Sequence, residues 1–174
     1  MTIRNYIVIH HTAAEEKNAR QVKQYHLSKG WKDVGYNYII EKEGVVVPGR
    51  SLEIPGAHTK ADGMNYKSIG ITLIGNLELR RPTEQQLISL LDLTVKLQRT
   101  YDIPKENVLL HREVAGANTL CPGKFFPTKE LSLQLIEPTK IWRVQVGAFT
   151  TKTRAADYAT RLRHIGIDAF VIEK

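Results

Sequence analysis

The sequence has little from which disulfides or membrane spans are built. Its 174 residues include one cysteine, Cys121, which excludes an intramolecular disulfide. No apolar run approaches the roughly 20 residues that a spanning helix needs, so we expect no membrane span. The opening "MTIRNYIVIHH" lacks the regions of a signal peptide. We therefore expect synthesis in the cytosol, and release by another agent if the protein acts outside the cell.

The chain also lacks runs of charge of one sign. It has 25 Lys and Arg against 18 Asp and Glu, which gives a formal net charge of +7, but no basic run reaches five residues. A positive surface attracts polyanions such as nucleic acid, membranes or anionic wall polymers. Because the charges are scattered, solubility explains them better than nucleic-acid binding, and we do not expect a nucleic-acid partner.

What is present is a chain that alternates between strand and helix patterns. Strands are predicted at "NYIVIH", "SIGITLIGN" and "NVLLH", and a hairpin at "GYNYIIEKEGVVVPG". Helices are predicted over residues 18–30, over 81–102 with a capping box at Thr83 and Gln86, and over 128–136. Residues 50–67 are rich in Gly, Pro, Asn and Asp, which predicts a long loop. This mixture predicts an α/β domain with a mixed central sheet flanked by helices.

The chain divides into two parts at a polar segment. Residues 1–136 form the predicted first domain, and residues 137–140, "EPTK", are the predicted linker. Residues 141–174 have a strand–helix–strand pattern, which predicts a small βαβ unit.

Histidines and the cysteine stand where strands end. His10 and His11 end the first predicted strand, His111 ends a later one, and Cys121 follows in a loop. Zinc takes imidazole nitrogen and thiolate sulfur, and three protein ligands leave a fourth position for water or substrate. Spacing alone leaves open a packed histidine and a buried, inert cysteine. Successive strand side chains point to opposite faces, so His11 is expected to point away from His10 in a structural role.

Five ordered blocks resemble one known family. They are "IVIHHTA", "GWKDVGYNYII", "PGR…GAH", "SIGITLIGN" and "HREVAGANTLCPG". Their order is that of the zinc-dependent N-acetylmuramoyl-L-alanine amidases, which include bacteriophage amidase-type lysozymes and peptidoglycan recognition proteins. The resemblance covers residues 6–126 and implies the same fold, with a zinc site at one edge of the sheet.

The resemblance also implies site residues. It assigns His10, His111 and Cys121 as ligands of Zn²⁺, and Tyr36 and Thr119 as catalytic residues. It places three further residues in the substrate groove, and these are Arg50, His58 and Asn65.

The sequence departs from one branch of the family, and two other histidines fall outside the implied site. Some amidases of this fold carry a glutamate base where this chain has Thr72, so that base is excluded. His26 is expected to pack on the first helix, and His164 to be exposed.

The implied activity is hydrolysis of the amide bond between N-acetylmuramic acid and L-alanine in peptidoglycan, by a phage or prophage endolysin that acts on the wall at lysis. Non-catalytic members of the family bind peptidoglycan and typically lack the zinc cysteine, so Cys121 and Tyr36 favour an enzyme. A peptidoglycan binder without activity is the alternative, and a nucleic-acid or polymerase binder is a third possibility.

The tail resembles a second module. "VQVGAF", "AADYATRLRHIG" and "DAFVI" are similar to the first half of the SPOR (sporulation-related repeat) domain, which binds peptidoglycan glycan. One such unit buries too little apolar surface to fold alone. It therefore either packs on the first domain or pairs with a second copy, and we expect a homodimer with bivalent wall contact.

Overall fold

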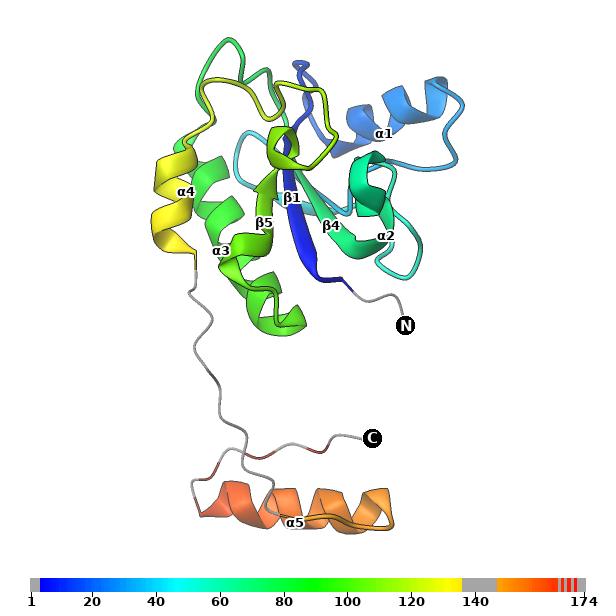
Figure 1. Cartoon of the computed structure of the whole chain (residues 1–174), viewed down its shortest axis with the longest axis vertical. Coiled ribbons are helices and arrows are strands. Elements are labelled where there is room, and N and C mark those ends of the chain that lie inside the picture. Colours follow the sequence, from blue (N-terminus) through cyan, green and yellow to red (C-terminus); the bar gives the residue numbers. More distant parts are fainter. Residues whose placement is uncertain (1–3, 136–146, 166, 168, 170, 172–174) are drawn as a thin grey trace. The chain divides into compact units, whose positions relative to one another are not determined.

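The computed structural model describes residues 4–135, 147–165, 167, 169 and 171 (Figure 1). The chain separates into two compact units, Met1–Thr139 and Lys140–Lys174. The expected linker at residues 137–140 lies outside the described residues, as do both domain limits on either side of it. Each unit is therefore described by itself.

The first unit is built on a five-stranded sheet. Its strand order is β3-β2-β4-β1-β5. Only the β2–β3 pair, which is the expected hairpin, is antiparallel, and the other pairs are parallel. The predicted mixed sheet is thus confirmed. The strands are β1 (Tyr6–His11), β2 (Tyr38–Ile40), β3 (Val46–Pro48), β4 (Ser68–Leu73) and β5 (Val108–Leu110).

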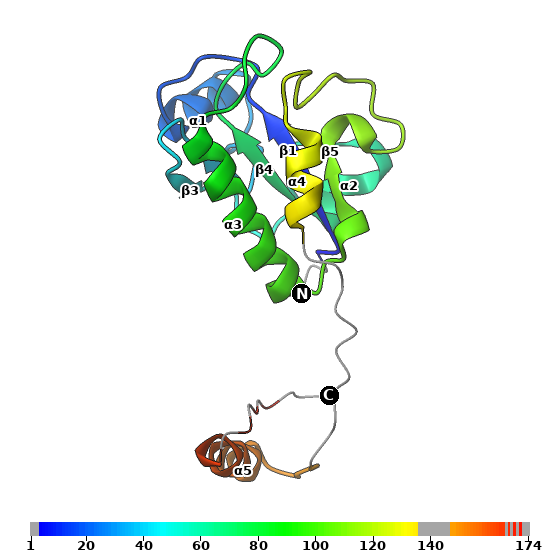
Figure 2. The ribbon, with the colours of Figure 1, turned by 90° about the vertical axis from the view of Figure 1, so that its left-hand side faces the viewer.

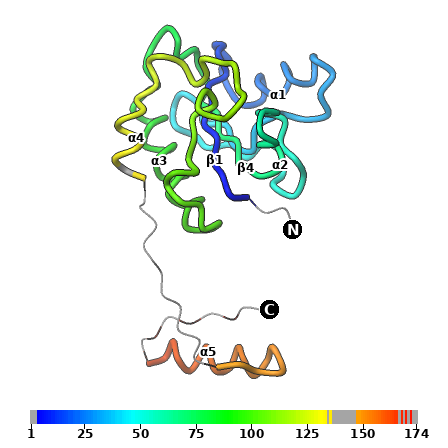
Figure 3. The backbone as a smooth tube through the Cα atoms, viewed as in Figure 1, coloured from blue at the N-terminus to red at the C-terminus, as the bar shows by residue number. Residues whose placement is uncertain are grey.

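Strand β1 is an inner strand that lies between β4 and β5, and it pairs with β4 along its whole length (Figure 3). Five of its six residues are buried, which accounts for the unbroken apolar run in the sequence. Its register sets His10 opposite Thr72 of β4, so these two side chains share one face of the sheet.

Two helices cover the face that carries Ile7 and Ile9. They are α3 (Glu84–Tyr101) and α4 (Thr128–Gln134), which lie in front of the sheet in Figure 2. Leu90 and Leu97 of α3 and Leu131 of α4 join the same buried cluster as the two isoleucines. This cluster is the main hydrophobic core, and burying each such side chain contributes about 1.5–3 kcal/mol.

The opposite face is covered by α1 (Ala19–Ser28) and α2 (Met64–Lys67), which lie on the other side of the strands from α3 in Figure 1. Ala19 and Val22 of α1 pack with Ile39, while Met64 of α2 packs with Val8. These two clusters are smaller, and the sheet face between them carries polar residues.

The predicted helix starts are confirmed. Asn18 caps α1 by accepting from the Gln21 amide. Thr83 and Gln86 form the expected capping box of α3. The side-chain amide of Gln86 also donates to the Ile40 and Ile74 carbonyls, so the same residue attaches α3 to the sheet.

The prediction of a loop over residues 50–67 was wrong at its end. A 3₁₀ turn at Ala61–Gly63 leads into α2. Asp62 and Gly63 have positive φ values of 49° and 64°, which separate the two turns. Each piece is one turn long, so no helical periodicity was available to read.

Arg4 fastens this segment to the start of β1. Its buried guanidinium donates to carbonyl oxygens on both sides of the segment, including Leu52 at 2.8 Å and Ser68 at 3.0 Å. These bonds satisfy the two terminal nitrogens of the buried charge, while Nε has no hydrogen-bond partner in the described structure.

In the second unit, the predicted helix is confirmed as α5 (Lys152–His164), with Thr151 as its cap. His164 is exposed, as expected. The two predicted strands lie partly outside the described residues, and their described positions, 147–149, 167, 169 and 171, are not in strands. None of the helices in the described parts of the chain is long and apolar enough to cross a bilayer.

Candidate functional site

Three residues from separate segments meet at the ends of neighbouring parallel strands. His10 lies in β1, His111 directly follows β5, and Cys121 lies in the loop beyond it. Their candidate ligand atoms all lie within 4.8 Å of one another. His10 Nδ1 is 3.7 Å from Cys121 Sγ, and the two imidazole centroids are 4.6 Å apart. The fold thus forms a possible metal site from the three expected residues, while their role as ligands stays a prediction.

The donor set fits a zinc ion. A tetrahedral ion with Zn–N near 2.1 Å and Zn–S near 2.3 Å holds the two donors about 3.6 Å apart. The His10–Cys121 distance of 3.7 Å agrees with this spacing. Two imidazoles and one thiolate are also ligands that zinc prefers.

Burial sets the protonation of these groups. It holds the pKa of His10 well below its usual value, with smaller contributions from His58 and His111, so His10 is neutral and able to ligate. Burial also raises the pKa of the Cys121 thiol to about 11, which the His11 amide and Arg112 oppose. A bound dication overcomes such a rise, because a coordinating thiol is deprotonated outright.

Arg112 joins the two later segments of the cluster. Its amide donates to the Cys121 carbonyl at 2.9 Å, and its guanidinium donates to the Gly123 carbonyl at 2.9 Å and to Thr128 Oγ1 at 3.0 Å. Arg112 therefore sets His111 beside the cysteine loop. Sequence reasoning missed this role, although the residue stands next to His111 in the "HRE" block.

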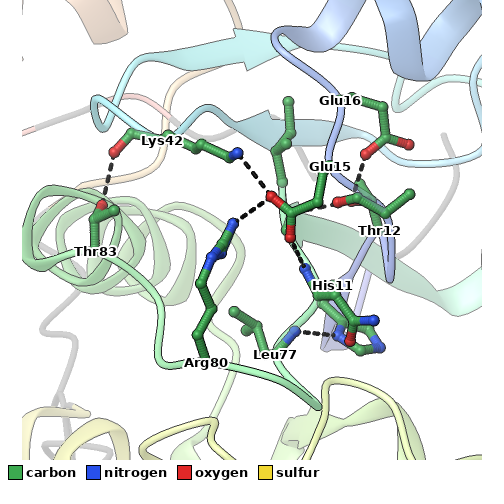
Figure 4. A network of polar contacts seen from close by, with 12 residues as sticks. His11, Thr12, Glu15, Glu16, Lys42, Leu77, Arg80 and Thr83 are labelled. Atoms are coloured by element: carbon green, nitrogen blue, oxygen red, sulfur yellow. Dashed lines mark hydrogen bonds and ion pairs between the residues drawn. The ribbon is translucent and has the colours of Figure 1, made fainter.

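His11 supports the cysteine loop from the opposite face of β1. Its Nδ1 accepts the Leu77 amide at 3.0 Å (Figure 4). The Leu77 carbonyl in turn accepts the Phe125 amide at 3.0 Å. Gly123, with φ of 103°, lies so close that a Cβ there would be 2.5 Å from the Leu77 carbonyl carbon. His11 thus has the structural role that strand alternation predicts.

Glu15, in the loop after β1, is the centre of an exposed ion-pair network. Glu15 accepts from Lys42 at 2.8 Å and from Arg80 at 2.6 Å (Figure 4). Exposed pairs of this kind contribute about 0–1 kcal/mol each. They help to hold the loops around the site, and the buried contacts dominate its stability.

Tyr36 lies beside His10, with 5.2 Å between the ring centroids. Burial, and to a lesser degree Cys121, raises the pKa of its phenol, while the nearby Thr72 hydroxyl opposes the rise. The phenol is therefore neutral at physiological pH and able to donate a hydrogen bond. Thr72 Oγ1 is itself buried and has no partner of good hydrogen-bond geometry in the described structure.

Thr119 stands two residues before Cys121 in the same loop and contacts its backbone. Its Oγ1 accepts the Cys121 amide at 3.1 Å. This contact uses a lone pair of the hydroxyl and leaves its hydrogen free to be donated. The expected catalytic role of Thr119 stays a prediction.

Each of the three expected substrate contacts, Arg50, His58 and Asn65, makes a polar contact within the domain. Arg50 Nε donates to the Val34 carbonyl at 2.8 Å. Asn65 Oδ1 accepts the amides of His58 at 2.8 Å and Thr59 at 2.9 Å. The His58 ring reaches the cluster directly, as described below. Their contact with substrate stays a prediction.

His26 packs behind Tyr36, as expected. It is 8% exposed, stacks on Trp31 at 4.5 Å between centroids, and lies 5.5 Å from the Tyr36 ring. Its Nδ1 accepts the Gly35 amide at 3.1 Å. The residue before Tyr36 is thus held by a neutral imidazole.

Fold and cluster together define a mixed α/β domain with a possible metal centre. Comparison with known families is more specific. The Amidase_2 model, described as N-acetylmuramoyl-L-alanine amidase, matches residues 1–124, and the chain belongs to this family. The SPOR domain model matches residues 128–173. The suspected family and the suspected second module are therefore confirmed.

Relatives include both endolysins and recognition proteins. The chain is 34% identical to an endolysin of Enterobacteria phage K11 over 122 residues, which are 65% of this chain and 77% of that protein. It is 38% identical to peptidoglycan recognition protein 1 of Mus musculus over 128 residues, which are 68% of this chain and 69% of that protein.

Solved structures of the family have the same fold. The amidase LysC from Clostridium intestinale URNW has a TM-score of 0.68 at 32% identity, covering 76% of this chain and 85% of LysC. Wild-type Drosophila PGRP-LB has a TM-score of 0.64 at 29% identity, covering 81% of this chain and 88% of that one.

The buried His26 predicts a pH dependence of stability. Burial, with a smaller effect of Arg50, lowers its pKa, and Glu16 opposes this. In the unfolded chain the pKa of His26 is about 6.5, so below that pH the unfolded state binds a proton before the folded state does. The contribution of neutral His26 to the free energy of unfolding is therefore full above that pH and falls as the pH decreases toward the pKa of the folded state. His26→Phe should cost about 1 kcal/mol at neutral pH and flatten this dependence.

Urea unfolding with a chelator present, at several pH values from about 7.5 to 5, measures both effects. His164→Phe, at an exposed position of α5, is the control. An identical pH slope in wild type and His26→Phe would contradict the assignment.

Proposed function

We propose that this protein is a zinc-dependent peptidoglycan amidase that hydrolyses the bond between N-acetylmuramic acid and L-alanine. The observation that carries the proposal is the convergence of His10, His111 and Cys121, with the Tyr36 ring 5.2 Å from that of His10. Family membership supplies the substrate class.

His10, His111 and Cys121 would hold the ion. A bound Zn²⁺ supplies a Lewis acid and lowers the pKa of a coordinated water to about 7. The neutral phenol of Tyr36 then donates a hydrogen bond to the oxyanion that develops on the scissile carbonyl. Thr119 has a hydroxyl hydrogen free for the same task. Preorganised donors of this kind act without reorganisation at the moment of reaction.

A peptidoglycan binder without activity is the competing function, because the relatives include recognition proteins. The complete donor set and the adjacent phenol favour the enzyme. A site that only binds needs neither an activated water nor a donor to an oxyanion. The similarity to phage endolysins supports a role in host lysis, in which a protein made in the cytosol reaches the wall after release.

Loss of one ligand should remove both metal and activity. Cys121→Ala, His10→Ala and His111→Ala should each abolish stoichiometric zinc and the release of new L-alanine amino termini from purified peptidoglycan. Metal analysis and a wall-digestion assay with and without chelator measure this. His164→Ala, in the exposed tail helix, should keep both.

Near-wild-type cleavage by Cys121→Ala would overturn the metal assignment. Stoichiometric zinc in the wild type without any amino termini released would instead favour the binder.

Tyr36→Phe should separate binding from chemistry. The substitution keeps the ring that packs between His10 and His26 and removes only the hydroxyl. Zinc content should stay the same, while kcat should fall about 10²–10³-fold, as for loss of one oxyanion donor. Tyr25→Phe, at an exposed tyrosine of α1, is the control. Unchanged turnover in Tyr36→Phe would remove Tyr36 from the mechanism.

We also propose that the second unit binds the wall and pairs two chains. Its described residues bury only Ala159 and Leu162, while Ile165, Ile167 and Val171 are 71%, 46% and 44% exposed. A symmetric partner would cover such residues and make wall contact bivalent.

Sedimentation equilibrium should therefore give a concentration-dependent dimer for the whole chain. Ile165→Asp should shift it toward monomer, and Thr153→Asp, at an exposed polar position of α5, should not. A concentration-independent monomer for the wild type would reject dimerisation.

A further inference from the structure

We propose that His58 is a positioning residue that fixes the orientation and tautomer of His10 through a hydrogen-bond relay ending on the backbone of α2. The inference rests on the proposed function, since it concerns how the zinc site is prepared. It gives His58 a task distinct from the substrate contact that the family resemblance implies.

The relay consists of three contacts in series. His10 Nε2 lies 3.0 Å from His58 Nδ1. His58 Nε2 lies 3.5 Å from Ser68 Oγ, and the Ser68 hydroxyl donates to the Met64 carbonyl at 2.6 Å. The path therefore leads from the candidate ligand, across β4, to the first residue of α2.

Only one set of proton positions is consistent with ligation. His10 Nδ1 is the nitrogen beside Cys121 Sγ, so its lone pair must face the ion and its proton must be on Nε2. His58 Nδ1 is then the acceptor, and its own proton is on Nε2, directed at Ser68 Oγ. Since the Ser68 hydrogen is donated to Met64, its oxygen is free to accept.

The surroundings of His58 are shaped to hold the ring in this place. A Cβ on Gly70 would lie 2.5 Å from the imidazole, and one on Gly56 would lie 2.7 Å from it. The two glycines thus leave the space that the ring occupies. Asn65 Oδ1 accepts the His58 amide at 2.8 Å, which fixes the backbone as well.

Such a partner has a measurable effect on metal affinity. A ligating histidine is oriented by the acceptor of its second ring nitrogen, and loss of that acceptor typically costs about 10–100-fold in affinity. A residue that only contacts substrate changes KM and leaves zinc affinity unchanged. The two roles are therefore separable without any activity measurement.

The test compares the zinc dissociation constants of wild type, His58→Phe, His58→Gln and Ser68→Ala, by competition with a chromogenic chelator. His58→Phe fills the same space without an acceptor and should weaken zinc about 10–100-fold. His58→Gln offers a carbonyl acceptor and should recover part of this loss. Ser68→Ala should have a smaller effect of the same sign.

Thermal unfolding of the metal-free proteins checks that the variants fold, and His26→Phe is the matched control. His26 is another buried histidine, and its ring accepts the Gly35 amide. Because no hydrogen bond in the described structure joins it to the three candidate ligands, its replacement should leave zinc affinity unchanged. Equal zinc affinity in wild type and a folded His58→Phe would overturn the inference alone. Failure of the wild type to bind zinc would instead overturn the proposed function.

Discussion

The parallel pairing of β1 with β4 and β5 is the constraint on which the site depends. It brings the end of the first strand beside the end of the last one, so that His10 and His111 become neighbours although they are 101 positions apart. The same pairing sets His10 opposite Thr72 on the polar face. Ile7 and Ile9 of the same strand point to the other face and enter the main core. One strand thus provides both the centre of the core and a candidate ligand.

Neutral histidines supply several of the hydrogen-bond acceptors around the cluster. His58 faces His10, His26 accepts the amide before Tyr36, and His11 accepts the amide of Leu77 under the cysteine loop. Each imidazole supplies an acceptor at a position where a backbone or ring N–H would otherwise be buried without a partner. The unusual density of histidines near the site therefore reflects support of the site as well as ligation.

The parts of the fold that follow from regular patterns were predictable from the residues, whereas the members of the cluster were predicted only through the resemblance to the amidase family. Alternation in β1 separates His10 from His11, and the capping box marks the start of α3. The contacts that surround the cluster could not be predicted from the sequence. Arg112 acts through contacts that only the folded loop creates, and the single turns before β4 are too short to leave a periodic signal.

The parallel pairing of β1 with strands made much later also determines when the site can exist. His10 leaves the ribosome about a hundred residues before His111 and Cys121, and a parallel pairing closes only after the intervening chain is made. Nascent chains therefore hold one candidate ligand for most of their synthesis. A complete cluster is a property of the finished domain, so a metal that binds to it would report completed folding rather than nucleate it.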